Sequence, residues 1–514
     1  MHEARNVHCR EIDSHGGVPS GAGRWRWREE QTPHDQRPVM GQPAAQPALD
    51  RRGAAVLLLL VLLVATAVRL VGVNFPSRTV VDEFWYVRDG CYYWTGSVEA
   101  CALAGLEAPD RDVETWLRTY GELTPEHPPL AKALIGLPVA VFGYRPTAWR
   151  LASIAAGVVT VALVFLLVLL LVRAVAAAAL AAGLLATDYI HVIHSRIGML
   201  EVFVALFAVA AMLFAALDRR QIERRAAGES WHPGWRAAAG IAAGAAAAPK
   251  LSGAVVVVAV LALVVAWEVQ RARRSDRPWE GAATTALSVI ALLVVLPGLA
   301  YAATYLGRLE GDLLAPPWAA DSWVRAFVER QLLMLEFHAA KPPVGTLPWT
   351  LPMTERPLQY ALERTPEGAL RTILLFGNPL IWWGGFIAVA VLAARALFGR
   401  SRPGAAIAVV GFAAAYAGWL IISLTGRPVH LFYAVPLAPF LAMALAVVVA
   451  GSPGSNRGRV AVAGLGALSA AAFVFYLPIL IGLPLSGADW EIRACSAQAL
   501  WLDPIEGCTR QPVP

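Results

Sequence analysis

The sequence has little charge and few cysteines. Only 16% of its 514 residues are Asp, Glu, Lys or Arg, whereas a soluble domain has about 25%. This shortage excludes an ordinary water-soluble globular protein. The formal net charge of +6 does not point to a nucleic-acid partner either, because the arginines cluster in short segments between apolar runs.

Apolar residues make up 57% of the chain. They recur in runs of roughly 17–25 residues, which are long enough to cross a bilayer as helices. The sequence therefore predicts an all-α polytopic membrane protein with about eleven transmembrane helices. We place these helices near residues 54–73, 148–172, 174–190, 198–217, 236–249, 251–268, 283–304, 370–395, 404–424, 429–450 and 458–481.

The distribution of arginine orients these helices. Several basic stretches fall on one side of the predicted bilayer, which the positive-inside rule assigns to the cytoplasm. The N-terminus is then cytoplasmic, and the loops 74–147 and 305–369 are extracytoplasmic. This scheme requires 130–143, which is short and contains Pro138, to be a surface helix rather than a span. The basic stretches are 219–225, 271–274, 395–402 and 457–459.

Three regions follow from this topology. Residues 1–52 are polar and rich in Arg, Gly, Pro and Gln, which predicts a disordered cytoplasmic tail. Residues 53–482 form the transmembrane domain, and 483–514 form an extracytoplasmic tail.

The five cysteines provide an independent check on the topology. Cys91 and Cys101 lie in the first outer loop, Cys495 and Cys508 lie in the outer tail, and only Cys9 lies inside. Two pairs on the oxidising side favour two local disulfides. Four unpaired thiols are the alternative that the sequence leaves open.

Adjacent carboxylates begin the first outer loop. Asp82 and Glu83 follow the first apolar run, where charge close to lipid is costly unless it performs chemistry or binds a ligand. A carboxylate can act as the general base that takes the proton of a hydroxyl attacking a sugar carbon. The alternative is a solvated start of the loop.

A second group of charged residues closes the same loop. Pro128 and Pro129 stiffen the backbone between His127 and Lys132, so the two side chains can hold an anionic headgroup near the membrane surface. A helix entry with proline in its first turn explains the pattern equally well. Arg150 follows at the outer end of the second span, close to the expected level of lipid phosphate.

A third group interrupts apolar sequence between residues 188 and 201. His191, His194 and Glu201 share one helix face, but this spacing is a weak metal motif without further ligands. The sequence thus requires no cofactor, and a divalent metal lacks support. Arg196 is better explained as a phosphate ligand, since a guanidinium binds phosphate through two parallel hydrogen bonds, and Lys250 is a second candidate.

Taken together, these segments resemble the protein O-mannosyltransferase family, membrane enzymes of the GT-C fold. The resemblance runs from about residue 54 to 450 and depends on the shared order of several short motifs. The matching motifs are Asp82-Glu83, His127-Pro128-Pro129-Leu130-Ala131-Lys132, Trp149-Arg150-Leu151, Ser195-Arg196-Ile197-Gly198-Met199-Leu200-Glu201, Lys250-Leu251-Ser252-Gly253, Trp349-Thr350-Leu351-Pro352 and Gly377-Asn378-Pro379.

The resemblance implies a function and a location. The enzyme would be an inverting glycosyltransferase of a bacterial plasma membrane. It would move mannose from a polyprenyl-phosphate donor to Ser or Thr hydroxyls of an exported polypeptide.

The resemblance also implies roles for residues. Asp82 would be the base with Glu83 beside it, and the basic side chains Arg150, Arg196 and Lys250 would contact donor phosphate. The supporting residues would be His127, Lys132, His194 and Glu201.

Two other functions stay open at this stage. Glu201 and Leu251 replace the Asp and Trp that are usual in the family, so the enzyme could use another sugar or a glycolipid acceptor. A transporter or flippase is a different class, but it would place charges on broken helices at mid-membrane and often shows inverted repeats. Here the charges gather at one face, and we detect no repeat.

Overall fold

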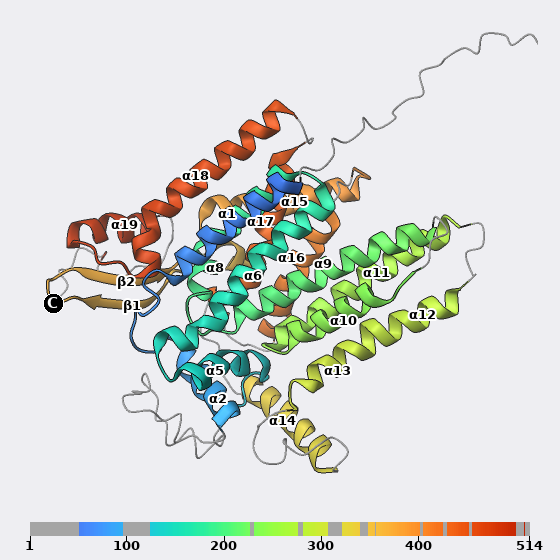
Figure 1. The fold of residues 1–514 in the computed structure, drawn as a ribbon, viewed down its shortest axis with the longest axis horizontal. Helices are drawn as coiled ribbons and strands as arrows, with labels where there is room; N and C mark the ends of the chain where they lie inside the picture. The colour runs from blue at the N-terminus through green and yellow to red at the C-terminus, as the bar shows by residue number, and fades with distance from the viewer. Residues whose placement is uncertain are drawn as a thin grey trace, which may run out of the picture. The chain divides into compact units, whose positions relative to one another are not determined.

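The computed structural model describes most of the chain after residue 50 (Figure 1). The predicted tail up to residue 50, including Cys9, lies outside the described residues, as does Cys101. The described residues are 51–95, 124–226, 231–275, 281–306, 321–339, 348–354, 356–400, 404–424, 429–451, 455–499 and 508.

Within those residues, eight helical segments are long and apolar enough to cross a membrane. Three further helices, α7 (Val175–Ala186), α10 (Gly234–Ala247) and α16 (Ala405–Ser423), coincide with the other predicted spans. The chain is therefore a mostly helical integral membrane protein, while the number of crossings stays a prediction. The eight segments are α1 (Arg51–Leu70), α6 (Pro146–Val172), α9 (Glu201–Ala226), η1 with α11 (Leu251–Ala254 and Val255–Arg273), α12 with η2 and α13 (Ala282–Ile290, Ala291–Val295 and Leu296–Ala303), α15 (Pro379–Leu397), η5 with α17 (Leu431–Leu437 and Ala438–Ala450), and α18 (Asn456–Ile481).

Two of these segments form the centre of the bundle. In the most apolar 18-residue stretch of α9, 78% of the residues are buried, and in that of η5 with α17 the share is 89%. The corresponding shares for α1 and α18 are only 17% and 11%. Helix α9 packs against α6, α10 and α11, and α17 packs against α15 (Figure 1). Because α1 and α18 keep large apolar side chains on their surfaces, these two helices present faces suited to lipid.

A β-hairpin departs from the predicted all-helical fold. Strands β1 (Leu358–Arg364) and β2 (Leu370–Leu375) pair antiparallel, so the predicted span 370–395 begins only at Pro379. Pro379 occupies the first turn of α15, and the Asn378 side chain caps that helix by accepting a hydrogen bond from the Leu380 amide at 3.1 Å. Apolar residues in β2 were mistaken for helix because a short buried strand is also an apolar run.

The predicted span 174–190 is also too long. Helix α7 ends at Ala186, and a separate short helix, α8 (Tyr189–His194), follows within the predicted loop 188–197. Asp188 starts α8, because its carboxylate accepts a hydrogen bond from the His191 amide at 2.8 Å. The break at Asp188 redirects the chain toward the candidate site.

Helix α5 (Leu130–Phe142) corresponds to the stretch predicted as a surface helix, and it packs against α2 (Glu83–Thr95). The contact is close because Gly90 faces Gly136: a Cβ on Gly90 would lie 2.1 Å from the Lys132 carbonyl oxygen. The remaining helices of the described chain are α14 (Asp321–Ala339), η4 (Pro348–Met353) and α19 (Gly487–Ala499).

The tail that follows α18 carries a disulfide between Cys495 and Cys508. Cys91 is also disulfide-bonded. Its predicted partner, Cys101, lies outside the described residues.

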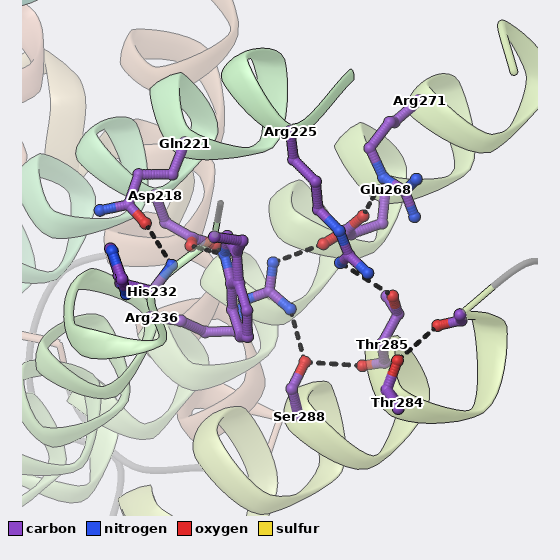
Figure 2. A network of polar contacts seen from close by, with 12 residues as sticks. Asp218, Gln221, Arg225, His232, Arg236, Glu268, Arg271, Thr284, Thr285 and Ser288 are labelled. Atoms are coloured by element: carbon purple, nitrogen blue, oxygen red, sulfur yellow. Dashed lines mark hydrogen bonds and ion pairs between the residues drawn. The ribbon is translucent and has the colours of Figure 1, made fainter. Parts of the chain in front are cut away.

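A buried polar network joins α9, α10, α11 and α12 (Figure 2). At its centre, the Arg236 guanidinium donates to Asp218 at 2.9 Å, to Glu268 at 2.5 Å and to Ser288 at 2.7 Å. Arg271 donates to the second carboxylate oxygen of Glu268 at 2.8 Å. Such pairing allows charge to be buried among apolar helices.

Candidate functional site

Glu83 forms a buried ion pair with Arg150, and both of its carboxylate oxygens have hydrogen-bond partners. Both of its carboxylate oxygens accept hydrogen bonds from Arg150, each at 3.1 Å. The carboxylate also accepts from the amides of Gly198 at 2.8 Å and Val80 at 3.0 Å. Glu83 therefore ties together three segments that are distant in sequence: the start of α2, the start of α6 and the turn after α8.

Arg150 completes the same structure. Its guanidinium donates to the carbonyl oxygens of Val73 at 2.7 Å, Phe75 at 3.1 Å and Arg78 at 3.2 Å. Glu83 and Arg150 are both fully buried. The predicted contact of Arg150 with donor phosphate stays a prediction, and it would compete with the carboxylate and backbone that its donors already bind. Glu83 likewise has the contacts of a scaffold rather than of a reacting group.

Asp82 differs from its neighbour in exposure and contact. It is half-buried, and its carboxylate accepts a hydrogen bond from the Tyr86 hydroxyl at 3.5 Å. Val81 before it has a φ of 53°, a left-handed conformation that is costly for a β-branched residue, about 1–3 kcal/mol. The adjacent Glu83–Arg150 pair holds this strained turn in place. Asp82 therefore occupies a partly exposed position in a turn that a neighbouring hydrogen bond holds in place.

Arg196 does not present a free guanidinium. It donates to the carbonyl oxygens of Val68 at 2.7 Å and Arg69 at 2.9 Å, and thereby satisfies the C-terminal end of α1. These contacts argue against the predicted phosphate-binding role of Arg196 and indicate a structural one.

Arg69 was overlooked in the sequence. It is fully buried, donates to the Ser195 hydroxyl at 2.7 Å and lies 2.9 Å from His191 Nδ1. An arginine in the last turn of an apolar helix is the pattern that would have revealed it.

Lys250 has a different environment. Its ammonium donates one hydrogen bond, to Glu201 at 2.6 Å, and lies 4.1 Å from the ring centre of Tyr433. The rings of Trp419 and Phe432, at 5.2 and 5.7 Å, complete an aromatic box. Because an ammonium has three donors, this one retains capacity for an anionic ligand. The box could not be predicted from the sequence, because its rings come from two separate elements, α16 and η5.

His194 extends this arrangement toward the hairpin. Its Nε2 lies 2.9 Å from the Tyr360 hydroxyl, and its Nδ1 lies 3.9 Å from Glu201 Oε2. Burial, followed by the charge of Lys250, lowers the pKa of His194 to about 3, so the imidazole is neutral at pH 7. His191 bonds to Arg69 instead, so the two histidines do not share a site. Within the described part of the chain, no three His, Cys, Asp or Glu side chains gather to hold a metal.

The predicted loop residues also have identifiable partners. Lys132 donates to Asp89 at 2.8 Å and to the Thr124 carbonyl at 2.9 Å, which fastens α5 to α2. Burial would raise the pKa of Asp89, but Lys132 and Arg88 together hold it below its usual value. The ring of His127 lies 6.0 Å from that of Tyr86. Lys132 thus supports the site through helix packing.

The charges of Asp82 and Glu201 both act on the phenols of Tyr86 and Tyr360. Burial, then the charges of Asp82 and Glu201, raises the pKa of Tyr86 well above its usual value. Burial, then the charges of Glu201 and Asp82, does the same to the pKa of Tyr360. Six residues form what we call the Asp82 cluster: Asp82, Tyr86, His194, Glu201, Lys250 and Tyr360. The cluster combines a partly exposed carboxylate, a lysine with unused donors and two neutral phenols.

Comparison with known proteins places this site in context. Residues 147–308 match the family model described as dolichyl-phosphate-mannose-protein mannosyltransferase. A polyprenol-phosphate-mannose–protein mannosyltransferase of Mycobacterium tuberculosis is 30% identical over 423 residues, covering 71% of this chain and 79% of the relative. The protein of the same name from Mycolicibacterium smegmatis is 29% identical over 421 residues, covering 71% and 80%.

Solved structures agree on the fold. The Saccharomyces cerevisiae protein O-mannosyltransferase complex Pmt1-Pmt2, bound to the sugar donor, superposes with a TM-score of 0.66 at 14% identity, covering 89% of this chain and 95% of that one. ArnT from Cupriavidus metallidurans in the apo state gives a TM-score of 0.50 at 18% identity, covering 83% and 71%. The predicted GT-C fold is confirmed.

Proposed function

Since the chain belongs to the family of the dolichyl-phosphate-mannose-protein mannosyltransferases, we propose that the Asp82 cluster transfers mannose from a polyprenyl-phosphate donor to Ser or Thr hydroxyls of exported proteins. The observation that supports the proposal is that the half-buried Asp82, in its strained turn, and Glu201, the partner of Lys250, act on the same two phenols, Tyr86 and Tyr360.

The proposed reaction is an inverting displacement. Asp82 takes the proton of the acceptor hydroxyl as its oxygen attacks the anomeric carbon. The bond from that carbon to the phosphate oxygen breaks, and the lipid phosphate leaves with the bonding electrons. Lys250 offers its unused donors to this phosphate, which develops charge as the bond breaks. Glu83, Arg150, Arg196 and Lys132 hold the surrounding backbone in place.

We also propose an orientation for this membrane enzyme. Arginines at the ends of α9 and α11, such as Arg220 and Arg274, favour a cytoplasmic location for that end of the bundle. The N-terminus would be on the same side, and the Asp82 cluster would face the extracytoplasmic side of a bacterial plasma membrane. The disulfide between Cys495 and Cys508 supports an oxidising environment for the C-terminal tail.

A transfer assay tests the proposed function. Purified protein in detergent would be mixed with radiolabelled polyprenyl-phosphate mannose and either a Ser/Thr-rich peptide or membrane glycolipids. We expect label in the peptide, with inverted anomeric configuration. Label only in glycolipid would replace the acceptor assignment, and transport of the donor without any transfer would overturn the enzymatic one.

Lys250→Gln tests the proposed phosphate contact. Loss of one charge-assisted hydrogen bond, about 1.5–3 kcal/mol, is expected to raise the KM for the lipid-phosphate donor by about 10- to 100-fold, with a smaller effect on the KM for peptide. Lys250→Arg keeps the charge and should lose less. Arg325→Gln is a control, because it removes an exposed cation from α14. An unchanged donor KM in Lys250→Gln would rule out the contact.

A further inference from the structure

Tyr360 is the extra residue of a β-bulge. Gln359 pairs with Leu374 and Ala361 pairs with Ile373, so Tyr360 between them has no partner in β2. A bulge breaks the alternation of side chains along a strand and redirects one of them, and bulges are frequent beside active sites. Here the redirected phenol reaches His194, with the hydroxyl 2.9 Å from Nε2. The hairpin thereby contributes one residue to the Asp82 cluster.

The position of Glu201 indicates which atom donates in the hydrogen bond between His194 and Tyr360. Its Oε1 accepts from Lys250 at 2.6 Å, and its Oε2, which is buried without a hydrogen-bond partner, faces His194 Nδ1 at 3.9 Å. Nδ1 is also buried without a hydrogen-bond partner. Because a carboxylate only accepts, we assign the proton of the neutral imidazole to Nδ1, which places an N–H rather than a lone pair opposite Glu201. In this tautomer Nε2 accepts the hydrogen bond that the Tyr360 hydroxyl donates.

This direction of the hydrogen bonds leaves the Tyr360 hydroxyl able to make further hydrogen bonds only as an acceptor. Its only proton is directed to His194, so the phenol oxygen can accept a hydrogen bond but cannot donate another. Tyr360 is half-buried, which leaves part of its surface accessible. Tyr360 is connected to Lys250 through His194 and Glu201, and the charges of Glu201 and Asp82 both act on its phenol. Tyr360 therefore belongs to the same cluster as the proposed phosphate ligand.

We propose that Tyr360 forms a subsite that accepts a hydrogen bond from one hydroxyl of the transferred sugar. The His194–Glu201–Lys250 chain sets its acceptor-only character. The inference rests on the proposed function, since it assumes a sugar linked to lipid phosphate. It adds a basis for sugar selectivity: a donor that lacks this hydroxyl leaves the phenol oxygen unpaired in a partly dry site.

Deoxy donors test the subsite. The full-length protein and Tyr360→Phe would be assayed with polyprenyl-phosphate mannose and with its 2-, 3-, 4- and 6-deoxy analogues. For the unmodified protein, we expect one analogue to lower kcat/KM by about 5- to 100-fold. Tyr360→Phe should lower kcat/KM for mannose by a similar factor, with no further loss for that analogue. Tyr476→Phe is the matched control, because its hydroxyl contacts Ser496 in the C-terminal tail.

The outcomes separate the two proposals. A merely structural role for Tyr360 would lower transfer from all donors equally, so unchanged discrimination in Tyr360→Phe would overturn the subsite. Equal transfer from all four deoxy donors by the unmodified protein would overturn it without any variant. In both cases mannose transfer continues, and the proposed function stands. Absence of mannose transfer by the unmodified protein would overturn both.

Discussion

Asp82→Asn is expected to lower kcat for mannosyl transfer by about 10²- to 10⁴-fold, the usual contribution of a general base. Asparagine has the shape of aspartate and can still accept from Tyr86, so the turn should be preserved, but its amide cannot take the acceptor proton. Donor binding should be nearly unchanged, because Lys250 is untouched. The measurement is the initial rate of mannosyl-peptide formation with saturating donor, together with donor affinity.

Asp489→Asn provides the control for this change. Asp489 lies on the exposed surface of α19, where it bonds to Ser486 and Arg493. Its replacement makes the same chemical change away from the cluster and should leave kcat within twofold, as surface substitutions usually do. Full activity in Asp82→Asn, with normal expression, would show that another group accepts the proton.

Arg150→Met is expected to have the largest effect on stability. It leaves Glu83 buried without its cation, and removal of one partner from a buried pair costs about 3–5 kcal/mol in the free energy of unfolding. Methionine approximates the length of the arginine stem, so the loss reflects charge and hydrogen bonds more than volume. Denaturant unfolding in mixed micelles, monitored by tryptophan fluorescence, would measure it.

A double-variant cycle shows whether the pair acts as one unit. Glu83→Gln should also destabilise the protein, and the combined variant should lose less than the two single losses added together, since neither charge is then buried alone. Arg325→Met, which removes an exposed partner of Glu329, is the control and should change stability by about 1 kcal/mol or less. Additive losses at Glu83 and Arg150 would contradict the coupling.

The sequence was sufficient to predict elements whose physical cause is local. Long apolar runs located the helices, because a bilayer requires hydrogen bonds to be satisfied within each span. The sequence singles out Asp82, Glu201 and Lys250 as candidates because charge next to apolar sequence is rare, and their roles stay predictions. The predicted start of span 370–395 was wrong, because β2 depends on strand pairing rather than on hydropathy. The predicted end of span 174–190 was wrong, because the break at Asp188 depends on helix capping.

The roles of the arginines could not be predicted in the same way. Sequence position places Arg150 and Arg196 near the expected phosphate level, but it does not show that backbone carbonyls and Glu83 occupy their donors. The aromatic box around Lys250 and the bulge at Tyr360 are products of tertiary packing. Asp89 is similar, because its partner Lys132 lies 43 residues away.

The network around Arg236 has a consequence for how the protein enters the bilayer. Helix α10 has 14 residues, and at 1.5 Å per residue it extends about 21 Å, less than the ~30 Å hydrocarbon core. A segment this short that also bears an arginine is a poor candidate for independent partitioning. Its neutralising partners, Asp218 and Glu268, belong to the helices made just before and just after it. We therefore expect these three helices to integrate into the membrane in a concerted step, with α10 retained until α11 has emerged.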